Sequence, residues 1–290
     1  MTPDKLKANG QQLGGRLRKS RHGNQSFRKL VKKFNDVGLP FTDDQFRSAD
    51  GSVFTTTAYK CRLDVGRIAW KRPRELFATG ATSYHDKQSS EIEQQQANIP
   101  VSLFPGKWPS TSEELGATLL YSGPNQWFIG VCLALATHRT ALLRPLLRPG
   151  DEEHLKRTGI VKATIWSFGT LQKVVVDDKL PVDSADGDVQ ALVFTKPWGP
   201  ARQAILWAPL LEKAYAKLYG SFEAMAAHGS LATALVDLTA GGSVQVASPL
   251  AEVMTAAAAA ATTELIAKEL SLKSLIFLQT KVVGKWSSKS

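Results

Sequence analysis

The feature that most constrains this chain is a run of ten apolar residues, Trp127 to Ala136, in which Gly130 counts as apolar. The turn-forming sequence Gly123-Pro124-Asn125 stands directly before it. The run is too long for a typical buried strand and too short to span a bilayer, so it predicts a helix that is apolar on every side. Such a helix belongs in the middle of a domain, with other elements packed around it.

Length and cysteine content set the outer limits of the interpretation. A chain of 290 residues can form one large domain or two modest ones. The two cysteines, Cys61 and Cys132, are too few for a disulfide framework or a structural zinc site, which fits a reducing compartment. No apolar run approaches the length of a transmembrane helix, and no apolar stretch of a secretory signal follows the basic start. We therefore expect a cytoplasmic protein without a membrane partner.

The positive charge is concentrated in an N-terminal arm. Residues 1–35 hold ten Lys and Arg residues against Asp4 alone, so they contribute +9 of the net charge of +10. Four glycines indicate that the first two dozen residues are irregular. Ser26 can then cap a short amphipathic helix, which Gly38-Leu39-Pro40 ends. Its apolar face would be formed by Phe27, Leu30, Val31 and Phe34.

Three interpretations of this arm stay open: a solvated tail, a mitochondrial presequence that would place the protein in the matrix, and an anchor on an acidic surface. We favour the anchor, whose affinity should fall as salt concentration rises. The basic residues expected to contact the partner are Arg16, Arg18, Lys19, Arg21, Arg28, Lys29, Lys32 and Lys33.

Four stretches, in the right order, resemble motifs of the calpain protease core. Residues 207–221 (WAPLLEKAYAKLYGS) are similar to the family's W-x-x-L-L-E-K-A-Y-A-K-x-x-G-S/C-Y/F. Residues 166–169 (WSFG) and 174–181 (VVVDDKLP) resemble W-x-F/Y-G-x-W-x-x-V-V-V-D-D-x-L-P. Phe41-Thr42-Asp43 with Phe46 and Phe54 resembles F-x-D-x-x-F…L-F, and residues 70–75 (WKRPRE) resemble W-x-R-P-x-E. Together these motifs cover residues 38 to about 280.

Calpains are cysteine proteases, so the resemblance implies an α+β, papain-like cysteine-protease fold. In that family the nucleophile lies in Q-G-x-L-G-D-C-W, at the start of the central helix. Aligning Trp127 with the family tryptophan puts Gln126 at the nucleophile position and Leu120 at that of the oxyanion-stabilising glutamine. An amide cannot be ionised to a nucleophile. Cys132 lies six residues further on in the apolar run, where a thiol is more typical of a small core residue.

Other functional motifs of the family are not found where they are expected. Neither G-H-A-Y nor N-P-W-G follows the 207–221 motif, so we expect only the first, mainly helical lobe and no second β-lobe. None of the five histidines has such a context, and we expect them at the surface or at helix caps. Ile205 occupies the place of a calcium-binding glutamate, so we expect no calcium there and no other metal or cofactor.

The remaining pattern predicts the organisation of the chain. We expect a basic arm at 1–37, a calpain-like core lobe at 38–281 with a polar insertion at about 83–99, and a polar tail at 282–290. Within the lobe, 162–168 and 171–176 predict a β-hairpin around Gly169, and 151–157 reads as a charged connector. Ser248-Pro249 favours the start of a further helix through the alanines 256–261.

These features favour a structural subunit over an enzyme. Calpain-like proteins without catalytic residues are numerous in kinetoplastid protists, and many are linked to the cytoskeleton or flagellum. The resemblance and the arm therefore imply a non-catalytic scaffold on an acidic protein surface such as tubulin, within a larger assembly. The alternatives are an RNA-associated structural subunit and a regulatory pseudoprotease that binds a partner in a retained cleft. An active enzyme would need a second chain to supply the nucleophile and the base.

Overall fold

The structure is a computed structural model that describes ten segments of the chain. They fall into two compact units, residues 1–243 and residues 244–290, which we describe separately. The predicted core lobe at 38–281 spans this division, and the helix of the predicted arm belongs to the first unit. The described segments are 25–54, 68–78, 100–105, 119–120, 125–167, 169–184, 190–197, 204–241, 256–272 and 274–276.

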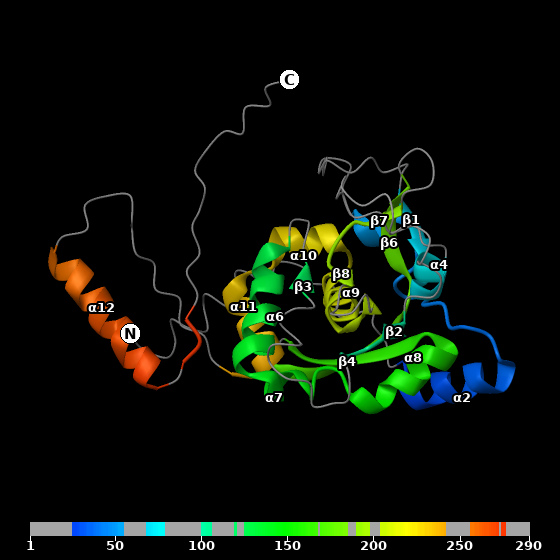
Figure 1. Cartoon of the computed structure of the whole chain (residues 1–290), viewed down its shortest axis with the longest axis horizontal. Coiled ribbons are helices and arrows are strands. Elements are labelled where there is room, and N and C mark those ends of the chain that lie inside the picture. Colours follow the sequence, from blue (N-terminus) through cyan, green and yellow to red (C-terminus); the bar gives the residue numbers. More distant parts are fainter. Residues whose placement is uncertain are drawn as a thin grey trace, which may run out of the picture. The chain divides into compact units, whose positions relative to one another are not determined.

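The predicted apolar helix is α6, Gln126–His138, and it lies in the core of the first unit (Figure 1). Phe128, Val131 and Leu135 are fully buried, and α6 packs against α9 (Trp207–Tyr219) and α11 (Leu231–Thr239). The expectation that all sides are covered is wrong in one respect, because Leu133 remains 42% exposed. It lies on the same side of the helix as Gln126, seven residues or two turns away, and Gln126 is also exposed.

Helix α9 lies between α6 and the strands and is the most deeply buried element of the first unit (Figure 1). Every residue from Trp207 to Lys217 is buried, which includes three charged side chains. The helix ends at Gly220, whose φ of 97° is a conformation that favours glycine. Most of the sequence motif 207–221 therefore forms a helix, and α10 (Phe222–His228) follows it directly.

The predicted hairpin is confirmed as β4 (Ile160–Ser167) and β5 (Thr170–Asp177). The strands pair antiparallel along their whole length, from Ile160 opposite Asp177 to Ser167 opposite Thr170. Gly169 in the turn has a φ of 74°, so the turn conformation itself favours glycine there. Burial alternates along most of β4, because only one face of the strand looks into the core.

The other described strands of the first unit are short. Strands β1 (Ile68–Lys71), β6 (Leu180–Ser184) and β7 (Gln190–Leu192) form an antiparallel sheet in the order β1-β6-β7. Strands β2 (Val101–Ser102) and β9 (Ala204–Ile205) pair in parallel, and β3 (Leu119–Leu120) pairs antiparallel with β8 (Lys196–Pro197). These pairs bring the chain before α6 next to the chain before α9. The short helices α3 (Asp50–Val53), α4 (Pro73–Ala78) and α7 (Thr140–Leu143) contact α10, β2 and α11, respectively.

The amphipathic helix of the arm is α2, Phe27–Val37. Val31 joins Phe41, Ile160 and Val175 in a hydrophobic cluster. Phe27, Leu30 and Phe34 pack against that cluster from the same side of the helix. Gly38 ends α2 with a φ of 69°, as predicted. Arg28, Lys29, Lys32 and Lys33 are all exposed on the opposite side.

The prediction of a connector at 151–157 is wrong, because this segment is helical. A 3-10 turn, η3 (Pro149–Asp151), leads into α8 (Glu152–Thr158). Leu155 and Thr158 are buried, and Lys156 pairs with Glu152 across one turn at 2.8 Å. A single apolar residue among charged ones gives too weak a period to be recognised in the sequence.

The second unit contains α12, Ala256–Ser271, which includes the predicted alanine-rich helix. Its predicted start at Ser248-Pro249, the polar insertion at 83–99 and the tail at 282–290 lie outside the described residues. The described residues have mixed helix and strand content, as expected for an α+β protein. None of their helices combines the length and the apolar character needed to cross a membrane.

Two glycines of the first unit should respond in opposite ways to alanine. A Cβ on Gly229 would overlap the ring of Trp127 and lie 2.7 Å from the carbonyl oxygen of Met225, whereas a Cβ on Gly130 meets nothing within 4 Å. We expect Gly229→Ala to lower the free energy of unfolding by about 1–3 kcal/mol. The matched control Gly130→Ala should raise it by about 0.5–1 kcal/mol, because alanine favours the helix interior. Urea unfolding of both variants measures this, and equal effects would contradict the packing of Trp127 on Gly229.

Candidate functional site: the start of the central helix

Gln126, the residue at the expected nucleophile position, is the first residue of α6, and its side chain is exposed. The residue before it, Asn125, is fully buried and acts as N-cap. Its carbonyl oxygen accepts hydrogen bonds from the amides of Phe128 at 3.0 Å and Ile129 at 3.2 Å. The helix therefore presents residue 126 to the surface at its positive end, but the group presented is a carboxamide with no ionisable proton for a base to remove.

The start of α6 is attached to α9 by a buried polar contact that the sequence did not reveal. The side-chain amide of Asn125 donates to Oε1 of Glu212 at 2.9 Å, and the backbone amide of Thr195 donates to Oε2 at 3.1 Å. Burial raises the pKa of Glu212, while the hydrogen bonds from Thr195 and Asn125 act in the opposite direction. Each carboxyl oxygen thus has a fixed donor, and this holds the first turn of α6 in place.

Cys132 is confirmed as a core residue. Its side chain is fully buried on α6. Burial, and then the charge of Glu212, raise the pKa of its thiol well above the ordinary value. A thiol that stays protonated and has no access to solvent cannot replace a nucleophile at position 126. Cys61 lies outside the described residues.

Leu120, at the expected oxyanion position, lies in β3 with its backbone opposite Lys196 of β8. Lys196 follows Thr195, the residue that donates to Glu212. The backbone near Leu120 is therefore close to the polar contact that holds α6. The residue itself is aliphatic and has no side-chain donor for a negatively charged oxygen.

Three histidines are described, and none is joined to Gln126 by a hydrogen bond within the described segments. His138 is at the opposite end of α6, and the ring of His154 packs edge-on against Phe27 of α2, with 5.6 Å between centroids. His228 ends α10 and is exposed. The next residue, Gly229, packs against Trp127 in the first turn of α6. Among the described histidines, His228 is therefore the one that adjoins a residue in contact with the start of α6.

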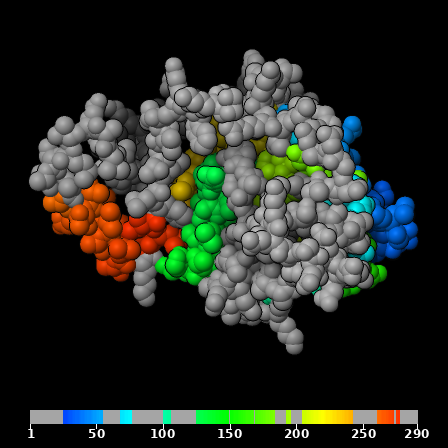
Figure 2. Space-filling model, turned by 45° about the horizontal axis from the view of Figure 1, so that its top comes forward, coloured from blue at the N-terminus to red at the C-terminus, as the bar shows by residue number. Residues whose placement is uncertain are grey.

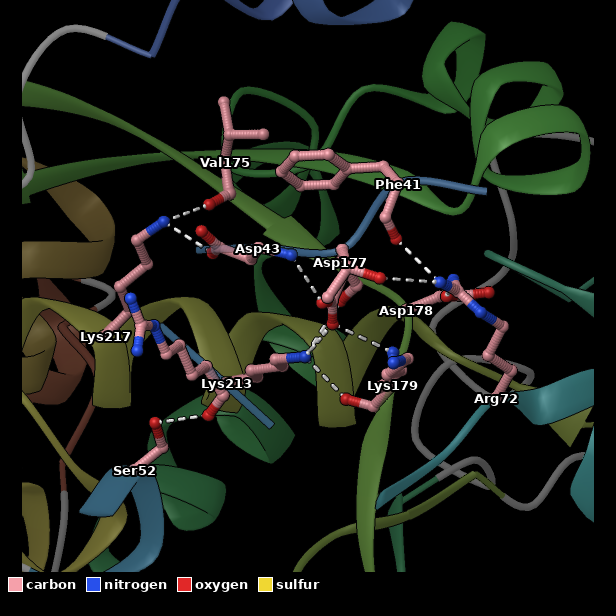
Figure 3. Close-up of polar contacts among 12 residues, drawn as sticks. Phe41, Asp43, Ser52, Arg72, Val175, Asp177, Asp178, Lys179, Lys213 and Lys217 are labelled. Carbon is pink, nitrogen blue, oxygen red and sulfur yellow. Dashed lines mark hydrogen bonds and ion pairs between the residues drawn. The ribbon is translucent and has the colours of Figure 1, made fainter. Parts of the chain in front are cut away.

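The largest group of charged side chains in the core lies on the other side of α9, where Lys213 and Lys217 project toward Asp177 and Asp43 (Figure 3). The ammonium group of Lys213 contacts Oδ1 of Asp177 and donates to the carbonyl oxygens of Asp177 at 3.1 Å and Lys179 at 2.5 Å. All three of its donors are therefore used. Both Lys213 and Asp177 have side chains with no exposed surface.

Lys217 repeats this arrangement one turn further along α9 (Figure 3). Its ammonium group donates to Oδ2 of Asp43 at 2.6 Å, to the carbonyl oxygen of Val175 at 2.7 Å and to the side chain of Gln25 at 3.1 Å. The two carboxylates are linked as well, because the amide of Asp43 donates to Oδ2 of Asp177 at 2.8 Å. Burial lowers the pKa of Lys217, and the charge of Asp43 opposes that shift.

A third pair, Arg72 and Asp178, extends the network toward the surface. The guanidinium contacts Oδ1 of Asp178 and donates to the carbonyl oxygen of Phe41 at 2.7 Å. Burial raises the pKa of Asp178 to about 6, although the charge of Arg72 opposes the shift. Gly159 lies against both side chains, where a Cβ would come within 2.7 Å of each, so close packing and a φ of 67° both require glycine here.

The network joins the sequence motifs that carry the family resemblance. Asp43, Arg72, Asp177 and Lys213 come from four separate motifs, and the network brings all four together. Because the charges are paired and hydrogen-bonded to one another, we interpret this cluster as structural. In the sequence, Lys213 and Lys217 stand inside an apolar stretch and Asp177 follows one, which is a signal of buried pairs, but the sequence did not show which residues pair.

No group of three or more His, Cys, Asp or Glu side chains suited to a metal ion occurs in the described segments. At the position of the family's calcium-binding glutamate, Ile205 is fully buried in β9 and pairs with Ser102. An aliphatic side chain has no oxygen for calcium.

Removing one partner of the innermost ion pair should be far more costly than removing a surface pair. We expect Lys213→Met to lower the free energy of unfolding by about 3–5 kcal/mol, because it leaves the buried carboxyl group of Asp177 without its ammonium partner. The control Lys156→Met removes a lysine whose side chain is 49% exposed, and should cost no more than about 1 kcal/mol. Equal losses in urea unfolding would show that the Lys213 pair is not shielded from water.

Comparison with known proteins identifies the family of the chain. Residues 123–289 match the family described as "Calpain family cysteine protease". The chain is 32% identical over 231 residues to "Calpain-5" of Caenorhabditis elegans, a match that covers 78% of this chain and 29% of that protein. It is also 38% identical over 219 residues to "Calpain-14" of Homo sapiens (75% of this chain, 26% of that protein) and 32% identical over 207 residues to "Calpain-10" of Mus musculus (69% and 25%). The chain thus spans less than a third of the length of these relatives. Because the family match covers more than half of the residues, the chain belongs to the calpain family of cysteine proteases.

Proposed function

We propose that this protein is a non-catalytic member of the calpain family that serves as a structural subunit of a larger assembly. The observation that carries the proposal is Gln126, an exposed carboxamide on the first residue of α6, where the family alignment puts the nucleophile. Cys132, the described cysteine, is fully buried and has a raised pKa. Acyl transfer needs an ionisable nucleophile next to a base, and neither residue supplies it.

We infer that the described residues retain the first lobe of a papain-like core as a packing module. The polar contact between Asn125 and Glu212 and the ion pairs of α9 support this, because both hold the fold in place without requiring chemistry at position 126. A protein that keeps the scaffold and lacks the reacting group is suited to binding other subunits.

The proposed partner is an acidic protein surface, with the microtubule lattice and a cytoskeletal or flagellar location as the favoured case. Residues 1–35 carry +9 of the net +10, and the part of this arm that the structure describes presents its basic residues outward. RNA is the second candidate, because a phosphate backbone attracts the same charges.

Restoring a cysteine tests the loss of catalysis. We expect full-length Gln126→Cys to leave casein uncleaved and to react with a peptidyl epoxide no faster than an ordinary exposed thiol. The helix N-terminus can favour a thiolate, but it cannot protonate a leaving amine. The controls are Gln126→Ala and the double variant Gln126→Cys/His228→Ala. Rapid, calcium-dependent labelling of Gln126→Cys would contradict the proposal, and its loss in the double variant would identify His228 as the base.

Truncation tests the arm. Deleting residues 1–24 removes six Lys and Arg residues and Asp4, a net change of −5, and keeps Gln25, which contacts Lys217. We expect a folded protein that cosediments more weakly with polymerised tubulin and shows a shallower dependence on salt. Circular dichroism controls for folding. Undiminished binding at low salt would mean that these residues are only a tail, and a steep linear loss with the logarithm of salt on RNA would favour the second candidate.

A further inference from the structure

We propose that the outward side of α2, extended by Arg157 of α8, is a preformed docking surface for a folded acidic protein with an apolar contact at its edge. This inference rests on the proposed function and names the part of the first unit that meets the partner. We call this surface the α2–α8 basic face. Its members are Arg28, Lys29, Lys32, Lys33 and Arg157.

The first argument is that the positive charges of this surface are not paired with negative ones. All five members of the α2–α8 basic face are exposed, and within the described segments none forms an ion pair. Lys33 lies over the ring of Phe34 at 5.5 Å. The exposed acids on the same two helices are Asp36 and Glu153, so the surface keeps an excess of positive charge. Such an excess attracts an acidic partner and raises the rate of association.

The second argument is that α2 is fixed to the first unit at both of its ends. At its start, Gln25 contacts Lys217 at 3.1 Å and Asp43 at 3.3 Å, and the ring of Phe27 lies 4.1 Å from the ammonium group of Lys162. At its end, the rings of Phe34 and Phe41 pack edge-on with 5.2 Å between centroids. A surface that is already ordered loses less conformational entropy on binding than a flexible tail.

The third argument joins α8 to this surface. The two helices are in contact, and the ring of His154 faces Phe27. Arg157 follows His154 by three residues, so it lies on the same side of α8, toward α2. The blue segment that contains α2 is exposed on the face of the molecule shown in Figure 2.

The last argument concerns the kind of partner. Val37 and Leu39, at the end of α2, are 56% and 59% exposed. All the large apolar side chains that are exposed in the described segments are aliphatic, whereas Phe27 and Phe34 on α2 are only partly exposed and pack against other rings. A base would therefore find no fully exposed ring to stack on in these segments. Aliphatic contacts beside positive charges fit a protein surface better than a phosphate backbone, which is bound through charge and hydrogen bonds.

Cosedimentation of the full-length protein with polymerised tubulin tests this surface, with a double-stranded RNA as the polyphosphate probe. Reversing the charges of Arg28, Lys29, Lys32 and Lys33 to Glu should lower the affinity for tubulin at low salt at least about tenfold. The matched control reverses Arg47, Arg144, Arg148 and Lys173, four other exposed basic residues of the first unit, with the same change of −8 in net charge. It should bind with an affinity within about threefold of the unmodified protein, since its changes lie outside the α2–α8 basic face. Arg157→Glu alone should weaken binding more than Arg148→Glu alone.

A second pair of variants tests the apolar edge. Val37→Ser/Leu39→Ser should remove the part of the binding that persists at high salt and leave the salt-dependent part intact. Leu171→Ser, a change at a residue that is 54% exposed on β5, is its control and should leave both parts unchanged.

Three outcomes would overturn the docking surface: equal losses in both charge-reversed proteins, no effect of Val37→Ser/Leu39→Ser, or tighter binding to the RNA than to tubulin at every salt concentration. These differ from failure of the proposed function. If the unmodified protein binds neither probe, the anchoring role itself is wrong, and the docking surface with it. Activity of Gln126→Cys would refute only the loss of catalysis.

Discussion

The rest of the first unit depends on the buried ion pairs that α9 makes with the chain around it. Lys213 and Lys217 project from one side of this helix and bind carboxylates from the hairpin strand β5 and from the segment before α3. Burying such charges is favourable only when every donor and acceptor is matched, as they are here by Asp177, Asp43 and backbone carbonyls. These pairs join the helix, the hairpin and the N-terminal segment to one another.

On the other side of α9, Glu212 determines the position of α6. It binds Asn125, so the first turn of α6 is held with residue 126 at the surface. In a cysteine protease this geometry would present the nucleophile. Here it presents a glutamine, and the polar contact behind it is intact. The contact is structural in its own right, because it holds the first turn of α6 whatever side chain stands at position 126.

The ion pairs also connect this core to the basic arm. Gln25 stands one residue before the N-cap of α2 and binds both Lys217 and Asp43, while the apolar side of α2 covers Phe41, Ile160 and Val175. The charged side of the helix is thereby directed to solvent in a fixed orientation. An arm that reads in the sequence as a possible tail thus ends in an element of the folded unit, and this is the basis for treating its surface as a binding site.

Local patterns in the sequence determined much of the secondary structure of this protein. The apolar run of α6, the hairpin around Gly169 and the amphipathic α2 were predicted, because hydrophobic period and turn residues act within one element. The stretch that forms α9 was identified by its resemblance to a family motif. The assignment of Gln126 to the nucleophile position of the family rests on the alignment alone. Helix α8 was missed, since Leu155 is a single apolar residue among charges. Only the tertiary structure decided the pairing of Asp43 with Lys217 and of Asn125 with Glu212, residues 174 and 87 positions apart. A sequence shows that a charge stands in an apolar stretch, but the cost of burying that charge is offset by partners that only the folded chain brings within reach.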